Sequence, residues 1–269
     1  MPHTWQDEVD HMRSELARSH ASLRLEEHRN RALPPLPLPS TSEEYDTSHN
    51  EAVSRFMTFL DEQEIIRVKQ YMDPALRARI GSFSSSGRPE HFFAEVDYRD
   101  PLTMRAHGYH WIELAHMREA PHPNPIRCGA LLYNIFQYRS EGLATGMEEF
   151  AMRASRGLAG LNVHANLHDV PTAADLAVEG VPRGWFRKRG PLVLGEQDLY
   201  LSQPGYGSTY LMGKLQLAEL MKDRSIQLGE EFSIRTFFEQ FNASGIIPIS
   251  LIRWEMTGRD DEIRELLPD

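Results

Sequence analysis

The sequence is poor in three features, and each scarcity excludes a class of protein. Cys128 is the single cysteine among 269 residues, so the chain cannot form an internal disulfide. It has no run of about 18 apolar residues, the length that a membrane-spanning helix needs. Residues 1–25 are charged and lack the apolar centre of a signal peptide. We therefore expect a cytoplasmic protein that has no membrane partner.

Basic residues are also scarce relative to acidic ones. The chain has 29 Lys and Arg against 39 Asp and Glu, which gives a formal net charge of -10. A phosphate backbone is bound mainly by clustered basic side chains, so we expect no nucleic-acid partner. The composition, 41% hydrophobic and 25% charged, is typical of a globular protein.

Residues 1–48 are predicted to form an N-terminal helical arm followed by a proline-rich spacer. Apolar side chains recur at helical spacing through residues 4–32, and Thr4 is a suitable residue to open that helix. Prolines crowd residues 33–42, where they remove hydrogen-bond donors and favour an extended chain. If the chain forms a homodimer, this N-terminal helix is where we expect the contact.

Residues 49–269 are predicted to form one mainly helical domain. A helical pattern covers about residues 49–80, with a break expected at Asp73-Pro74. Residues 91–98 read as a short extended piece, and alternation typical of strands is otherwise scarce. Residues 207–228 and 233–243 read as helices that end at Gly229 and Gly245, since glycine commonly follows a helix end.

Three histidines at intervals of six residues are the main candidates for metal chemistry. On a helix, His110, Glu113 and His116 lie within an arc of about 120°, so they could face one metal ion. His122 follows six residues later. A carboxylate from another helix would complete a two-histidine site, and Glu141 is the candidate. The alternative is that these are ordinary core or surface side chains.

Further polar groups follow along the chain. Glu148 lies seven residues after Glu141 on the same expected helix face. His164 and His168 have the spacing of a helical metal pair, but residues 169–171 predict a turn there. We expect His164, Tyr206 and Tyr210 to act as donors to negative charge that develops on a reacting oxygen.

The order of several motifs resembles the domain-of-unknown-function 885 family of zinc peptidase-like proteins, over residues 87–256. Residues 116–123 are similar to the family's His-Glu-x-x-Pro-Gly-His-His, and residues 141–144 to its Glu-Gly-Trp-Ala. Residues 153–156 resemble its Arg-Ala-x-Arg, and residues 203–213 its Pro-Gly-Gln-Ala-x-x-Tyr-x-x-Gly. The resemblance implies a helical, gluzincin-like metalloenzyme core with few short strands.

The resemblance also implies a zinc ion, held either by His116 and His122 or by His110 and His116, together with Glu141. Met117 or Trp111 stands where the family has its catalytic glutamate, depending on which histidine is first. The remaining candidates for a base are Glu113, Glu119 and Glu148. The expected function is therefore a metal-dependent enzyme acting on a small organic molecule, as a hydrolase, lyase, hydratase or isomerase.

Two other readings stay open. Glu113 and His116 form a Glu-x-x-His motif, which helical di-iron oxygenases use, so iron is the alternative to zinc. The third reading is a relative without catalytic activity that binds a partner through residues 4–32 and the proline-rich spacer.

Overall fold

The computed structural model describes residues 4–34, 37–87, 97–101, 104, 107–129, 137–148, 151–179 and 190–267. The elements in these ranges are helical: α1 (Trp5–Asn30), α2 (Ser42–Glu62), α3 (Met72–Arg77), α5 (Gly108–Glu119), the π-helix η1 (Gln137–Glu141), α7 (Gly142–Glu148), α8 (Ala151–His164), α9 (Val170–Glu179), α10 (Pro191–Ser202), α11 (Tyr206–Leu228), the 3-10 helix η3 (Gly229–Glu231), α12 (Ile234–Ala243), α13 (Ile249–Thr257) and α14 (Asp261–Arg264). A mainly helical fold is confirmed.

The few strands that we expected are not seen in the described ranges, where Asp97 is the one bridge residue. The predicted extended piece at residues 91–98 lies mostly outside those ranges. None of the described helices is both long and apolar enough to cross a membrane.

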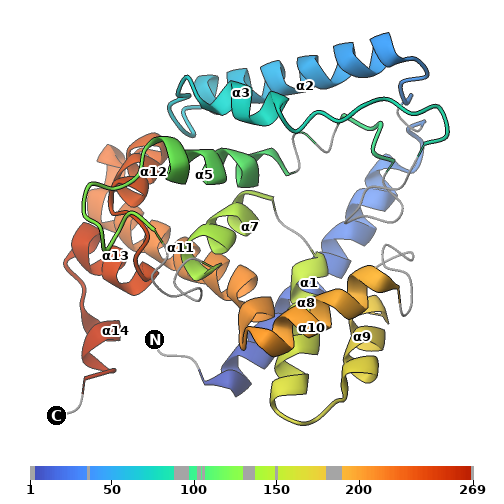
Figure 1. Ribbon diagram of the computed structural model, residues 1–269. Coiled ribbons are helices and arrows are strands. Elements are labelled where there is room, and N and C mark those ends of the chain that lie inside the picture. Colours follow the sequence, from blue (N-terminus) through green and yellow to red (C-terminus); the bar gives the residue numbers. More distant parts are fainter. Residues whose placement is uncertain are drawn as a thin grey trace.

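The first helix agrees closely with its prediction. Thr4 caps α1 by accepting a hydrogen bond from the Asp7 backbone N–H at 3.3 Å, and Asp7 bonds back to the Thr4 N–H at 2.8 Å. Val9 and Met12 are buried in a cluster with Leu161 and other side chains of α8 and α11. Figure 1 shows α1 crossing α8 at close range. The start of α1 is thus packed on the rest of its own chain.

The next helical stretch differs from its prediction. α2 begins at Ser42, inside the predicted spacer, because Thr41 caps it by accepting from the Glu44 N–H at 3.2 Å. The break that we expected at Asp73-Pro74 is wrong, since Pro74 lies in the first turn of α3, where a missing N–H costs nothing. The helix is interrupted earlier, over residues 63–71, where Glu64 has a φ of 50°.

The largest core joins α2, α3 and α5 to α7 and to the C-terminal helices. Figure 1 shows α5 below the α2–α3 layer and above α7. The fully buried side chains of this core come from all of the helices that it joins: Val53, Leu60, Leu76, Ile112, Leu143, Leu220, Phe237, Phe241 and Ile252. Each such side chain contributes about 1.5–3 kcal/mol when it leaves water. This core holds α5 between two layers of helices.

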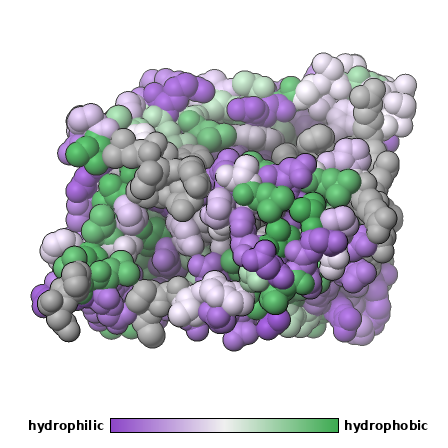
Figure 2. Space-filling view, turned by 60° about the horizontal axis from the view of Figure 1, so that its bottom comes forward, coloured by the Kyte–Doolittle hydropathy of each residue, from purple (hydrophilic) through white to green (hydrophobic). Residues whose placement is uncertain are grey.

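Large apolar side chains are also exposed at several separate places. Figure 2 shows hydrophobic and hydrophilic residues intermixed over one face. α10 exposes Leu199 and Leu201, α13 exposes Trp254, and α1 exposes Trp5 and Leu25. These positions lie on separate elements, so exposure alone does not mark one docking face.

α7 and α11 cross with their backbones almost touching. A Cβ on Gly213 would lie 2.8 Å from the Cα of Gly142 and would overlap the carbonyl oxygen of Tyr138. Only glycine allows this approach, which places η1 directly against α11. The crossing therefore fixes the position of the η1 backbone, from which its side chains extend.

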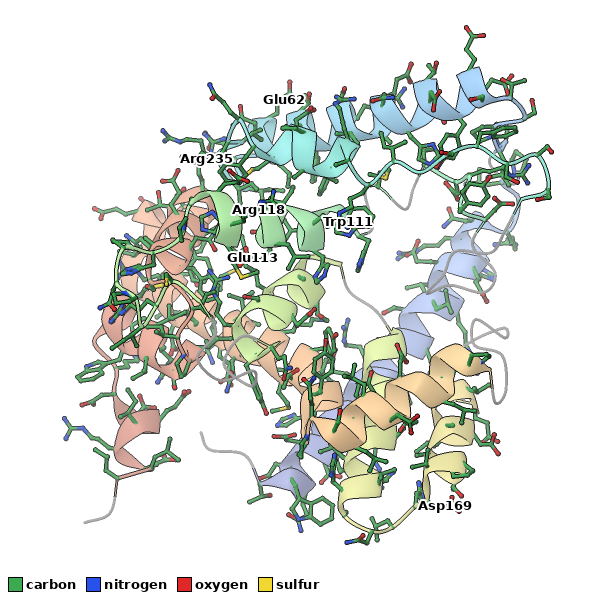
Figure 3. The ribbon with its side chains drawn as sticks, viewed as in Figure 1. Glu62, Trp111, Glu113, Arg118, Asp169 and Arg235 are labelled. Atoms are coloured by element: carbon green, nitrogen blue, oxygen red, sulfur yellow. The ribbon has the colours of Figure 1, made fainter. Side chains whose placement is uncertain are left out.

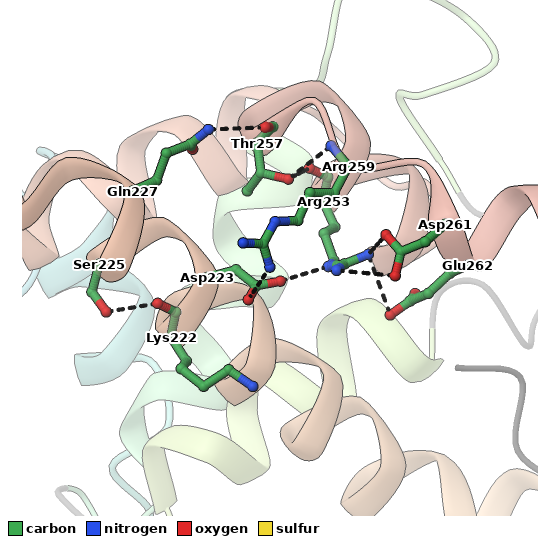
Figure 4. Close-up of polar contacts among 9 residues, drawn as sticks. All are labelled: Lys222, Asp223, Ser225, Gln227, Arg253, Thr257, Arg259, Asp261 and Glu262. Carbon is green, nitrogen blue, oxygen red and sulfur yellow. Dashed lines mark hydrogen bonds and ion pairs between the residues drawn. The ribbon is translucent and has the colours of Figure 1, made fainter.

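Ion pairs close the C-terminal end of the molecule. Asp223 of α11 accepts from Arg253 Nε at 2.9 Å and from Arg259 Nη1 at 2.6 Å, and Arg253 Nη1 also donates to Asp261 at 2.7 Å (Figure 4). The Asp223 and Arg253 side chains are mostly buried, with exposed fractions of 8% and 10%. The network thereby holds α13 and α14 on α11.

We predict that Gly213→Ala destabilises the fold by about 3 kcal/mol or more, because the added methyl group meets backbone atoms that cannot rotate away. Gly195→Ala on α10 is the matched control, since nothing lies within 4 Å of its Cβ position. It should stabilise by about 0.5–1 kcal/mol through helix propensity. Urea unfolding of both variants gives the comparison, and equal stabilities would contradict the close crossing.

We predict that Asp223→Asn lowers the free energy of unfolding at pH 7 by about 2 kcal/mol, because the mostly buried Arg253 loses a charged hydrogen-bond partner and keeps only Asp261 and Glu262. Burial alone would raise the pKa of Asp223, but Arg253 and Arg259 outweigh it and hold the pKa below its usual value. This stabilisation is present above about pH 4 and is lost as the pH falls through the lower folded pKa.

The stability of Asp223→Asn should accordingly fall less steeply with acid than that of the wild type. Asp10→Asn removes an exposed pair with Arg13 and should change stability by less than about 0.5 kcal/mol. Thermal melts between pH 2.5 and 7 measure both effects. Parallel acid profiles for the wild type and Asp223→Asn would contradict the assignment.

Candidate functional site

A pocket of about 630 Å³ opens between residues 66–72, α5 and α12. This volume suits a small organic molecule. Ile66, Met72, Ile112 and Phe238 provide apolar walls, and the polar lining residues are Arg67, Lys69, Tyr71, Tyr109, Glu113, His116, Glu239 and Asn242. We call this cavity the α5–α12 pocket. Two residues singled out from the sequence, Glu113 and His116, lie in its wall.

His116 is held by a tyrosine that the sequence did not suggest. Its Nδ1 lies 2.7 Å from the hydroxyl oxygen of Tyr71, on the irregular segment before α3. Burial, and then the charge of Lys69, lower the pKa of His116. Burial, and then the charge of Glu119, raise the pKa of Tyr71. At neutral pH the pair is thus a neutral imidazole bonded to a neutral phenol.

Beneath this pair lies a buried ion pair between Glu113 and Arg139. The two side chains are 3% and 1% exposed. Arg139 comes from η1, donates to Asn242 Oδ1 of α12 at 2.9 Å, and lies 4.9 Å from the centre of the Phe241 ring. Burial lowers the pKa of Arg139 to about 10, so it remains a cation at neutral pH. In Figure 3, Glu113 lies on the side of α5 that faces α7.

A second, much smaller cavity lies behind His116. Its volume is about 20 Å³, enough for one water molecule or small ion. His116, His122, Cys128, Arg139 and Asn242 are among its lining residues, and we call it the inner cavity. His122 is half-buried, and its Nδ1 accepts from the Asn124 N–H at 3.0 Å. One predicted ligand pair, His116 and His122, therefore lines a common space.

The other predicted ligands lie elsewhere. His110 Nδ1 is 3.6 Å from Glu141 Oε2, and the ring of His107 stacks on His110 with centroids 5.0 Å apart. His110 precedes His116 by six residues, which is about 9 Å along a helix, so the two face different neighbours. Although His110 and His116 share an arc on the helical wheel, their side chains do not meet at one point.

Within the described ranges, no group of three or more His, Cys, Asp or Glu side chains is arranged to hold a metal ion. The carboxylate expected beside His116 and His122 lies by His110, and the Arg139 cation lines the inner cavity instead. The four predicted ligands do not fit a single zinc site in this arrangement, so the ligand set stays a prediction.

The other predicted residues whose side chains are described lie outside the α5–α12 pocket. Glu119 accepts from Arg118 Nε at 2.8 Å on the surface, and the side chain of Glu148 lies outside the described residues. His164 Nε2 is 2.7 Å from the Tyr200 carbonyl oxygen, at the end of α8. The hydroxyl groups of Tyr206 and Tyr210 lie 2.8 Å apart. His164 and these tyrosines border α10 rather than α5, so they belong to a different part of the molecule.

Four residues of the site were not found from the sequence: Lys69, Tyr71, Arg139 and Asn242. Only Arg139 carried a usable signal, as a charge within the mainly apolar residues 130–144. A charged side chain in such a run needs a buried partner. Lys69 and Tyr71 lie in a segment without periodicity, where no pattern points to a site.

No family model and no curated protein matches this chain. Among solved structures, it is similar to the "putative lipoprotein from Colwellia psychrerythraea", with a TM-score of 0.58 and 14% sequence identity. The match covers 97% of this chain and 53% of that protein, so the chain spans about half of its length. At this identity the likeness shows a shared fold alone.

We predict that Glu113→Gln lowers the free energy of unfolding by about 3–5 kcal/mol, because it leaves the Arg139 charge buried and unpaired. The double variant Glu113→Leu with Arg139→Met removes both charges and keeps a similar volume. It should recover most of that loss, and urea unfolding of the wild type, Glu113→Leu, Arg139→Met and the double variant gives the double-mutant cycle that measures the coupling. Additive losses would contradict the ion pair.

Proposed function

We propose that this chain is an enzyme that carries out acid–base chemistry on a small organic molecule bound in the α5–α12 pocket. The observation that supports it is the His116–Tyr71 pair in the wall of a pocket of about 630 Å³. A histidine that is neutral near pH 7 and fixed by a hydrogen bond is suited to exchange a proton with a substrate.

The direction of the Tyr71–His116 hydrogen bond decides what His116 offers to the substrate. If the Tyr71 O–H donates to Nδ1, then Nε2 carries the proton and acts as an acid or hydrogen-bond donor. If Nδ1–H donates to the phenol oxygen, then Nε2 is unprotonated and acts as a base. In both cases Tyr71 is a positioning residue that fixes the ring.

The buried ion pair has a supporting role in this proposal. Glu113 and Arg139 neutralise each other, and Arg139 also bonds to Asn242, so the floor of the pocket is rigid. A rigid floor holds a substrate at a constant distance from His116. The apolar side chains Ile112 and Phe238 exclude water from the same region.

A zinc-dependent hydrolase, lyase, hydratase or isomerase is the second candidate. It is supported by the motif order that resembles the zinc peptidase-like family, and by His116 and His122 lining the inner cavity. A zinc ion there would act as a Lewis acid, with His116 and His122 as two of its ligands. The iron alternative needs Glu113 as a ligand, so it requires Glu113 to leave Arg139. A non-catalytic binding protein requires neither a metal ion nor a histidine that transfers protons.

Four single substitutions separate these candidates: His116→Gln, Tyr71→Phe, His122→Gln and His110→Gln. With a panel of small esters, amides, lactones and β-hydroxy acids, His116→Gln should reduce turnover by about 100-fold or more. Tyr71→Phe should cost about tenfold through lost orientation of the ring. His122→Gln and His110→Gln should change little, and they serve as matched histidine controls.

Metal analysis of the same proteins completes the test. One zinc per chain that is lost in both His116→Gln and His122→Gln, together with activity, would establish the second candidate instead. Two irons per chain would favour the oxygenase. If His116→Gln and His110→Gln have equal turnover, His116 has no chemical role and the acid–base proposal is wrong.

A further inference from the structure

Two cations and two carboxylates line the α5–α12 pocket, but the ion pairs that the carboxylates form leave one of the cations without a partner. Two carboxylates line it, and each is matched by an arginine: Glu113 by Arg139, and Glu239 by Arg67, whose Nε lies 3.2 Å from Glu239 Oε1. Lys69 also lines the pocket. Among the described residues, no carboxylate lies within ion-pair distance of its ammonium group.

Lys69 lies on the same segment as Tyr71, the hydrogen-bond partner of His116. Lys69 lies two residues before Tyr71, whose hydroxyl bonds to His116, and its positive charge adds to the effect of burial in lowering the pKa of the His116 imidazole. One end of the pocket thus combines a cation with the polar groups of Tyr71 and His116. Ile66, Met72 and Phe238 provide the apolar surface beside it.

The sign of this charge is unusual for the chain. The formal net charge is -10, so the surface as a whole repels anions. A lysine that only increases solubility could lie anywhere on the surface and need not lie at a pocket. A cation that stands without a carboxylate at the rim of a mainly apolar pocket matches a ligand with one negative group and an apolar body.

We propose that the α5–α12 pocket binds a small organic acid, whose carboxylate lies against Lys69 and whose apolar body lies against Ile66 and Phe238. This inference rests on the proposed function, because it names the class of substrate for the same pocket. It places the anionic group within reach of His116 and therefore next to the atoms that react.

Matched pairs of aromatic acids and their primary amides test the charge requirement. The probes are benzoate, phenylacetate and 3-phenylpropionate, each compared with the corresponding amide by saturation-transfer NMR titration at low salt. We expect each acid to bind about fivefold to tenfold more tightly than its amide. Added salt should reduce the difference, because Lys69 is exposed at the rim.

Three variants connect the preference to Lys69. Lys69→Met should abolish the preference for the acid, and Lys69→Arg should keep it. Lys222→Met removes the same charge from the exposed surface of α11, away from the pocket, and should leave the preference unchanged. A preference for the acid that survives Lys69→Met would overturn the inference.

A blocking variant separates failure of this inference from failure of the proposed function. Ala120 is exposed at the pocket wall, so Ala120→Trp should fill the opening without disturbing the core and abolish binding of acids and amides alike. If acids and amides bind equally and both are lost in Ala120→Trp, the charge requirement is wrong and the pocket stands. If no probe binds, or Ala120→Trp has no effect, the pocket and the proposed function both fall.

Discussion

The buried ion pair between Glu113 and Arg139 is the contact on which the candidate site depends. It joins α5 to η1, and Arg139 extends it to α12 through Asn242. Two charges that are almost completely removed from water must stay together, since either alone would carry a large desolvation cost. The pair therefore fixes the separation of the helices that form the α5–α12 pocket, and with it the position of His116.

Helix ends were predictable where a local signal determines them. Thr4 opens α1, and Gly229 and Gly245 follow the ends of α11 and α12 with positive φ angles. These signals act through the nearest few residues, so the sequence alone contains them. Pro74 was misread because a proline can begin a helix as well as end one, and which applies depends on the preceding residues.

The site was only half predictable, for a geometric reason. Helical spacing placed His110, Glu113 and His116 on one side of α5, but it did not account for their separation along the axis. Each therefore meets a different partner: Glu141, Arg139 and Tyr71. Tyr71 lies 45 residues before His116, in an irregular segment. Contacts of this kind depend on the packing of separate elements, which no sequence period encodes.

The charges around His116 differ between the two spaces that it lines. Met117 places an apolar side chain next to His116, and Arg139, paired with Glu113, lines the inner cavity that His116 and His122 share. Glu113 offsets the charge of Arg139, so this wall of the inner cavity is close to neutral. Lys69 has no carboxylate partner among the described residues, so positive charge remains on the pocket side of His116. If the α5–α12 pocket binds an anionic substrate, as we propose, this difference would draw it to the pocket side of His116.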